Sequence, residues 1–198
     1  MTMATNWIQY DCNSEVYYLL PGVKDGILCF VKSELHCDSW AKSKNTVHAI
    51  ILNYFKEALE AHPEDFSGDV ATFKKEYDKD RACFKLVIYR DTLLKGFSVA
   101  FTITILNKTY YLSCINTKEL RFKEGDPPKK IDGSTSDVIF YQKNASKGDA
   151  SSFVFESALV QGYCLAFKNE DGKHKLTLKR PEDQVDETTH FRTVPKKS

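Results

Sequence analysis

The stretch Ser151-Ser-Phe-Val-Phe-Glu-Ser-Ala-Leu-Val-Gln-Gly-Tyr-Cys-Leu-Ala-Phe167 decides how the rest of the chain is interpreted. Two apolar runs, residues 153–159 and 163–167, flank Gly162, so the pattern predicts two β-strands that fold back on each other through a short turn. The period of two places alternate residues on one face of each strand: Phe153, Phe155, Ser157 and Leu159, then Tyr163, Leu165 and Phe167. Such a hairpin buries only half of itself, so we expect a larger β core beneath it.

The clearest strand pattern lies upstream, over residues 97–105, where apolar residues alternate with Ser, Ala and Thr. Asn107-Lys108 is expected to form a hairpin turn, after which Tyr110, Leu112 and Cys114 return along the first strand. Further strands are predicted over residues 84–89, 120–123, 138–142, 175–179 and 191–194. Short strands joined by Gly, Pro, Asn and Asp predict an antiparallel barrel or sandwich.

The order Phe-x-Ser-Ala, glycine, aromatic, Leu-Ala within the opening stretch resembles the signature segment of the interleukin-1 cytokine family. Three neighbouring segments extend the resemblance: Leu120-Arg-Phe-Lys-Glu-Gly-Asp-Pro-Pro128, Ser136-Asp-Val-Ile-Phe-Tyr-Gln-Lys143 and Lys175-Leu-Thr-Leu-Lys179. Their order and spacing are similar to the interleukin-18 branch of that family. The general signature has a proline where this chain has Gln161 and a threonine where it has Phe167, and the interleukin-18 branch also lacks that proline.

The resemblance implies a fold that the letters alone do not show. It predicts an all-β protein, a β-trefoil of twelve strands with pseudo-threefold symmetry, over residues 39–198, preceded by a propeptide over residues 1–38. The three repeats would span about residues 42–90, 91–142 and 143–194. The opening hairpin would then belong to the third repeat.

Residues 47–61 give two conflicting signals. Ile51, Phe55, Ala58 and Leu59 fall on one helical stripe, with Lys56, Glu57 and Glu60 opposite and Pro63 after them, so the pattern alone predicts an amphipathic helix. The resemblance places the first strands here, and a trefoil barrel cannot close without them. We therefore expect strands.

The first 38 residues differ in charge from the rest of the chain. They hold five acids and two lysines, net −3, whereas the other 160 residues hold 22 acids and 26 bases, net +4, and the two parts sum to +1. Their aromatic and apolar content is too high for a disordered tail, so we expect part of this segment to pack against the body of the protein as one or two short strands. The polar stretch at residues 39–45 predicts an exposed linker.

The resemblance also implies a function, that of a pro-inflammatory cytokine that acts by contact. In this family a leaderless cytoplasmic precursor is cut by an inflammatory caspase and secreted by a non-classical route. The product is a monomer that joins an α receptor to a β signalling receptor and in some cases meets a soluble binding protein. The implied cut lies between Asp38 and Ser39, with Leu35, His36 and Cys37 completing the recognition sequence.

Family positions also suggest receptor contacts. Lys95, Phe97 and Lys143 match positions that contact the α receptor, although Phe97 also fits the core stripe that contains Val99. Lys123 and Asp137 match positions that face the β receptor, although exposed charges at strand ends are usually only solvated.

The sequence lacks the motifs of the common enzyme and cofactor-binding classes. There is no signal peptide pattern, no transmembrane stretch, no phosphate-binding glycine loop and no His-Glu-x-x-His. The six cysteines lack Cys-x-x-Cys spacing and the five histidines are scattered, so we expect reduced thiols, no metal, no cofactor, no nucleic-acid partner and no enzyme activity. The sequons at Asn107 and Asn144 should stay unoccupied without a secretory route.

One alternative function remains, a β-trefoil module that binds glycans or heparin without signalling through a receptor. Its basic residues would be Lys173, Lys175, Lys179 and Arg180. A solvated strand face, with Leu176 and Leu178 pointing inward, explains the same residues equally well.

Overall fold

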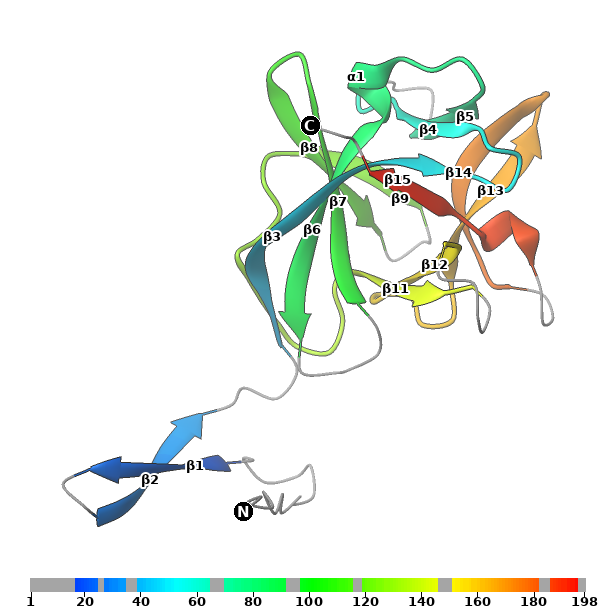
Figure 1. Cartoon of the computed structure of the whole chain (residues 1–198). Helices are drawn as coiled ribbons and strands as arrows, with labels where there is room; N and C mark the ends of the chain where they lie inside the picture. The colour runs from blue at the N-terminus through cyan, green and yellow to red at the C-terminus, as the bar shows by residue number, and fades with distance from the viewer. Residues whose placement is uncertain are drawn as a thin grey trace.

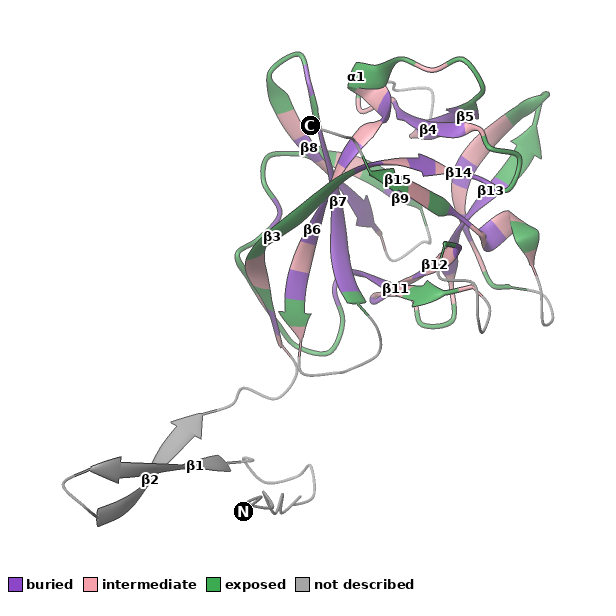
Figure 2. Ribbon diagram, in the orientation of Figure 1, coloured by how far each residue is buried: buried purple, intermediate pink, exposed green. Residues whose placement is uncertain are grey.

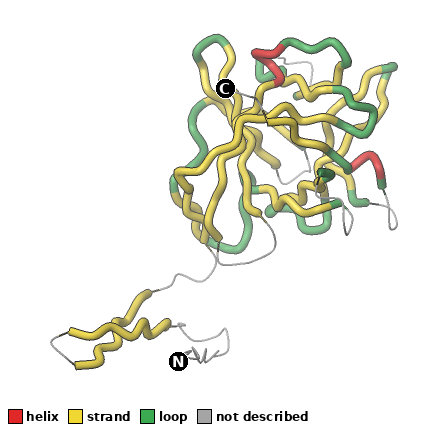
Figure 3. Tube along the Cα trace, in the orientation of Figure 1, coloured by secondary structure: helices red, strands yellow, loops and turns green. Residues whose placement is uncertain are grey.

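The structure, a computed structural model, describes residues 17–24, 27–34, 39–64, 70–91, 97–115, 119–145, 151–181 and 186–195. In these residues the chain is almost entirely β-strand (Figure 3), with one short α-helix, α1 (Lys79–Ala82), and one 3-10 turn, η1 (Glu187–Thr189). Neither of these helical segments is long and apolar enough to cross a membrane.

The main body consists of three successive groups of four strands. The first group is β3 (Ser39–Leu52), β4 (Ala58–Ala61), β5 (Ala71–Lys74) and β6 (Cys83–Asp91). The second group is β7 (Phe97–Ile105), β8 (Lys108–Cys114), β9 (Leu120–Glu124) and β11 (Phe140–Asn144). The third group is β12 (Phe153–Ser157), β13 (Cys164–Glu170), β14 (Lys173–Lys179) and β15 (Arg192–Pro195).

The first and last strands of each group close a barrel (Figure 1). β3 pairs with β6, β6 with β7, β7 with β11, and β11 with β12. A bridge between Phe153 and Phe191 joins β12 to the start of β15, which pairs back onto β3. The middle strands of each group form the hairpins β4–β5, β8–β9 and β13–β14. Three such groups make a β-trefoil, and the predicted repeats coincide with them to within about ten residues.

One large apolar residue from each of five barrel strands, and Phe191 just before the sixth, fill the centre of the barrel. These residues, each at most 1% exposed, are Ile51, Phe84, Phe101, Phe140, Phe155 and Phe191. The Phe101 ring lies with its centroid 5.0 Å from that of Phe155 and 5.6 Å from that of Phe140, in edge-to-face contacts that aromatic pairs favour. Buried residues are therefore concentrated on the barrel strands, whereas most of the turns are exposed (Figure 2).

Three details differ from the sequence prediction. The stretch from residue 39 is not a linker, because β3 begins at Ser39 and Trp40 is 0% exposed. The turn after β7 is Leu106-Asn107, one residue earlier than predicted, and both residues have positive φ, as a type I′ hairpin turn requires. In addition, β10 (Lys130–Asp132) pairs with the start of β3 and gives the main sheet of the described region thirteen strands.

The conflict over residues 47–61 is resolved in favour of strands, as expected. β3 runs to Leu52, a turn follows, and β4 starts at Ala58. Lys56 in the turn has φ 61, a left-handed conformation that a continuous helix cannot contain. Within residues 1–38, β1 (Tyr17–Lys24) and β2 (Ile27–Glu34) confirm the expected strands, but they pair with each other in a separate antiparallel sheet and not with the main sheet.

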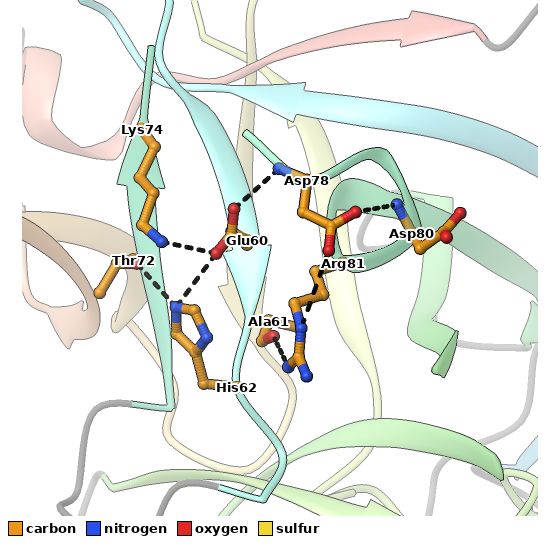
Figure 4. Close-up of polar contacts among 8 residues, drawn as sticks. All are labelled: Glu60, Ala61, His62, Thr72, Lys74, Asp78, Asp80 and Arg81. Carbon is orange, nitrogen blue, oxygen red and sulfur yellow. Dashed lines mark hydrogen bonds and ion pairs between the residues drawn. The ribbon is translucent and has the colours of Figure 1, made fainter. Parts of the chain in front are cut away.

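A buried carboxylate ties the first hairpin to the segment that precedes α1 (Figure 4). Glu60 on β4 accepts hydrogen bonds from Lys74 Nζ at 2.6 Å and from the Asp78 backbone N–H at 3.0 Å. Burial alone would raise the pKa of Glu60, but these hydrogen bonds and the nearby charges of Lys74 and His62 outweigh it and lower the pKa. Glu60 is therefore ionised at neutral pH and stabilises this end of the fold.

Candidate binding surfaces

The first candidate surface lies where β7 begins. Phe97 is 72% exposed, whereas Val99, two residues further along the same face, is 1% exposed. Phe97 therefore lies beyond the end of the core stripe and does not belong to it. An exposed phenylalanine at a strand end contributes little to folding and is available to a partner.

Lys143 lies close to Phe97 because their strands pair. Phe97 is opposite Gln142 in the β7–β11 ladder, and Lys143 is the next residue of β11. The Lys143 ammonium pairs with Glu156 on β12, whose other carboxylate oxygen accepts the Gly162 N–H at 2.9 Å. Glu156 thus holds Lys143 at the end of the barrel where β7 begins. Glu156 is itself held by the turn at Gly162, which has a positive φ of +76. We call Phe97, Gln142 and Lys143 the Phe97 surface; Lys95 lies outside the described residues.

The second candidate surface contains an ion pair between two of the predicted residues. Lys123 Nζ on β9 lies 2.7 Å from Asp137 Oδ2, and Asp137 also accepts the Ser113 hydroxyl at 2.7 Å. Burial alone would raise the pKa of Asp137, but the bonds from Lys123 and Ser113 outweigh it and lower the pKa. The hydrogen bond to Asp137 raises the pKa of Lys123. Both groups are therefore charged at neutral pH, and the ion pair fixes where they lie.

Asp137 also borders an open groove of about 800 Å³. The lining includes apolar residues, among them Ile115, Ile131 and Val138, and the charged residues Arg121 and Lys130. We call this groove, together with Lys123, the Asp137 surface. It offers a partner an apolar floor beside an oriented pair of charges.

The sequence profile of the family described as Interleukin-1 / 18 matches residues 76–192, which is more than half of the chain. The chain belongs to this family.

Curated members of the family match over most of the chain. Interleukin-18 of Gallus gallus is 36% identical over 84% of this chain and 88% of its own length. Interleukin-18 of Mus musculus is 36% identical over 84% and 86%. Interleukin-18 of Capra hircus is 40% identical over a shorter stretch, 63% of this chain and 66% of that protein. The predicted resemblance to interleukin-18 is confirmed, and an enzyme function is excluded because this family consists of cytokines.

Solved structures confirm the trefoil. Chicken interleukin 1 beta superposes with a TM-score of 0.57 over 78% of this chain and 98% of its own, at 18% sequence identity. A mutant of Gallus interleukin-1 beta gives a TM-score of 0.59 at 17% identity, over 78% and 99% of the two chains. At such low identity these structures show the fold alone.

Of the implied cleavage site, only Ser39 lies within the described residues. Ser39 is the first residue of β3, where it pairs with Asp132 of β10. Leu35, His36, Cys37 and Asp38 lie outside the described residues. The main sheet of the described region begins where the propeptide is predicted to end.

Sequence reasoning missed one exposed aromatic pair. Tyr54 and Phe55, in the turn between β3 and β4, are 52% and 53% exposed. Phe55 stacks on the His174 ring at 5.2 Å, and His174 Nδ1 lies 2.6 Å from Glu57 Oε2. In the sequence Phe55 stands out only as part of the helical stripe of the alternative that was set aside, and Tyr54 is not singled out. The positive φ of Lys56 is a backbone property that the sequence pattern did not indicate.

Two of the four basic residues of the glycan alternative form ion pairs within the described part of the chain. Lys175 Nζ lies 3.1 Å from Glu170, and Lys179 Nζ lies 2.9 Å from Asp186. Leu176 and Leu178 on the same strand are buried. This arrangement is the solvated strand face that the sequence also allowed.

The thiols of the described body are free. Cys114 and Cys164 are buried, and Cys83 is half-buried. Burial raises the pKa of Cys164 to about 11 and also raises the pKa of Cys114. In the described parts of the chain, no three His, Cys, Asp or Glu side chains are grouped to hold a metal ion.

Proposed function

We propose that this chain is the precursor of a pro-inflammatory cytokine of the interleukin-18 type. The observation that carries the proposal is the 36% identity to chicken interleukin-18 over 84% of this chain. An inflammatory caspase cuts after Asp38, and the trefoil domain leaves the cell by a non-classical route. It then binds an α receptor and recruits a β receptor, and it acts by contact alone.

The Phe97 surface binds the α receptor. The support is geometric: an exposed phenylalanine begins β7, and an ammonium group held by Glu156 lies one residue beyond the register partner of that phenylalanine on β11. A partner that covers the ring gains apolar burial, and a carboxylate of that partner complements Lys143. Lys95, two residues before Phe97, lies outside the described residues and is assigned to the same contact from its family position alone.

The Asp137 surface recruits the β receptor. Lys123 comes from the β8–β9 hairpin of the second repeat, whereas the Phe97 surface is built on β7 and β11 of the barrel. The ion pair orients both charges, and the groove beside it accepts apolar side chains of the second receptor. Separate surfaces allow one cytokine to hold two receptors at once.

Cleavage between Asp38 and Ser39 releases the trefoil from its propeptide. Caspases require aspartate before the cut because a basic pocket pairs with its carboxylate, and inflammatory members favour a bulky apolar residue three positions earlier, here Leu35. The domain boundary supports this position, because β3 starts at Ser39 whereas β1 and β2 form a sheet of their own. The rival Asp25-Gly26 bond has Gly22 at the position of Leu35.

Incubation of the full chain with an inflammatory caspase tests this proposal. The expected products have a new amino terminus at Ser39, and none form when Asp38 is replaced by alanine. Binding to the α-receptor ectodomain should appear only after the cut. Full binding by the uncut chain would contradict activation by cleavage.

A further inference from the structure

Trp40 is an unusual residue to find buried so close to the end of a domain. It is the second residue of β3, yet it is 0% exposed. It packs within a second core cluster, separate from the barrel centre, that includes Tyr89, Ala100 and Ile139. A tryptophan buried at this depth normally satisfies its indole N–H with a defined partner.

That partner is Ser98, and the contact continues to Asp91. The Trp40 Nε1–H donates to Ser98 Oγ at 3.2 Å, and the Ser98 hydroxyl donates in turn to Asp91 Oδ2. Asp91 is the last residue of β6, whereas Ser98 is the second residue of β7. The chain of hydrogen bonds therefore fastens the ends of two neighbouring barrel strands to the start of β3. We call these three residues the Trp40 clamp.

The clamp adjoins the Phe97 surface directly. Ser98 is 1% exposed and follows Phe97, which is 72% exposed. Ser98 is also opposite Tyr89 on β6 and Tyr141 on β11. Its position is thus fixed from both neighbouring strands and, through its hydroxyl, from Trp40 and Asp91. Phe97 is the first residue of its strand, so its orientation depends on how firmly Ser98 is held.

We infer that Trp40 is a positioning residue for Phe97. Through the Ser98 hydroxyl, Trp40 holds the first two residues of β7 in the orientation in which Phe97 meets the α receptor. This inference rests on the proposed role of the Phe97 surface. Trp40 itself touches no receptor, because it is fully buried. Without the clamp the start of β7 frays, and affinity falls by the fraction of molecules in which Phe97 is misplaced.

The test uses the caspase-cleaved chain and two substitutions that remove opposite ends of one hydrogen bond. Trp40→Phe keeps an aromatic ring but lacks the indole N–H, and Ser98→Ala removes the acceptor. Each should weaken α-receptor binding by about three- to fivefold, the size of one ordinary buried hydrogen bond. The double variant should lose no more affinity than Ser98→Ala alone, because that substitution already removes the Trp40–Ser98 hydrogen bond together with the Ser98–Asp91 bond. Additive losses would overturn the inference.

A background substitution separates positioning from general destabilisation. With Phe97→Ala already present, Trp40→Phe should cause no further loss of affinity, because the residue that it positions is gone. Ile103→Val, in the barrel core at 1% exposure, serves as the matched control that lowers stability without touching the clamp and should leave affinity unchanged. If Trp40→Phe lowered α-receptor affinity by the same factor with and without Phe97, the positioning role would be refuted.

Hydrogen exchange gives a readout that does not depend on receptor binding. Trp40→Phe should speed amide exchange in a peptide covering the start of β7 while leaving a β8 peptide unchanged. In Ser98→Ala, the emission of Trp40, the one tryptophan left after cleavage, should stay that of a buried indole. Unchanged exchange at β7 would overturn the inference even if Phe97 proved to be no receptor contact. If Phe97→Ala alone leaves affinity intact while exchange responds to Trp40→Phe, the clamp stands and the proposed α-receptor surface fails.

Discussion

Replacing Phe97 by alanine tests the α-receptor surface most directly. Phe97 is 72% exposed in the free chain. A phenylalanine side chain presents about 200 Å² of apolar surface, so about 145 Å² is available for a partner to cover. Covering it contributes about 3.6 kcal/mol at about 25 cal/mol per Å², and the side-chain freedom lost on binding costs about 1 kcal/mol. The difference, about 2.5 kcal/mol, corresponds to a Kd that is about 70-fold weaker.

The same exposure predicts that folding is almost unaffected. A substitution on the surface changes the free energy of unfolding by about 0.5 kcal/mol or less, which shifts Tm by about 2 °C at most in a domain of this size. The assay pairs surface plasmon resonance against the α-receptor ectodomain with a thermal melt of the same caspase-cleaved sample. Leu106→Ala is the matched control, because Leu106 is 76% exposed at the tip of the β7–β8 hairpin.

Two results would refute this reasoning. An unchanged Kd for a folded Phe97→Ala variant would remove Phe97 from the interface. A comparable loss of affinity for Leu106→Ala would show that any exposed apolar side chain contributes, so the contact would not be specific to the Phe97 surface.

Three further predictions concern charge, pH and thiols. The pair Lys123→Glu with Asp137→Lys keeps an ion pair but reverses it, so α-receptor binding should remain while recruitment of the β receptor, measured by co-precipitation, falls; equal losses in both assays would contradict two separate surfaces. Because the folded pKa of Glu60 lies below 4.5, Glu60 contributes stability that is present above pH 4.5 and is lost as pH falls through the folded pKa. Denaturant titrations should show that Glu60→Gln lowers the free energy of unfolding by about 1–3 kcal/mol at pH 7. A difference in free energy of unfolding that does not become smaller at acid pH would contradict this. An alkylating agent without reductant should label the native cleaved chain first at the half-buried Cys83 and label three sites after denaturation; no labelling in a denatured monomer would show that the thiols are blocked.

The strands with a strong alternating pattern could be predicted from the sequence because large apolar residues recur at every second position, even in β7, where the small and polar residues between them are mostly buried as well. Residues 97–105 were identified in this way, and β7 occupies those residues. β10 could not be predicted, because three residues give too short a pattern. The turn at Leu106-Asn107 was displaced by one residue, since leucine is not a residue that signals positive φ.

The candidate sites were predictable in their residues but not in their contacts. The family resemblance gave Lys123 and Asp137 as separate positions, whereas only the fold shows that they form one ion pair at 2.7 Å. Trp40 was assigned to an exposed linker because its neighbours are small and polar. Its burial is decided by strands more than forty residues away in the sequence, and no local pattern reports such contacts.

The pairing of the first residues of β3 has a kinetic consequence for processing. Trp40 and Ala41 pair with β10 on one side and with β6 on the other, whereas a protease must thread the residues after the cut through its cleft as a single extended strand. A cut just before Ser39 therefore requires a transient unzipping that also withdraws Trp40 from its cluster. Re-exposing about 200 Å² of indole surface costs about 5 kcal/mol, which leaves about one molecule in several thousand open at any moment. The rate at which the shorter form appears is then set by how often this strand opens, and a free peptide of the same sequence would be cut thousands of times faster.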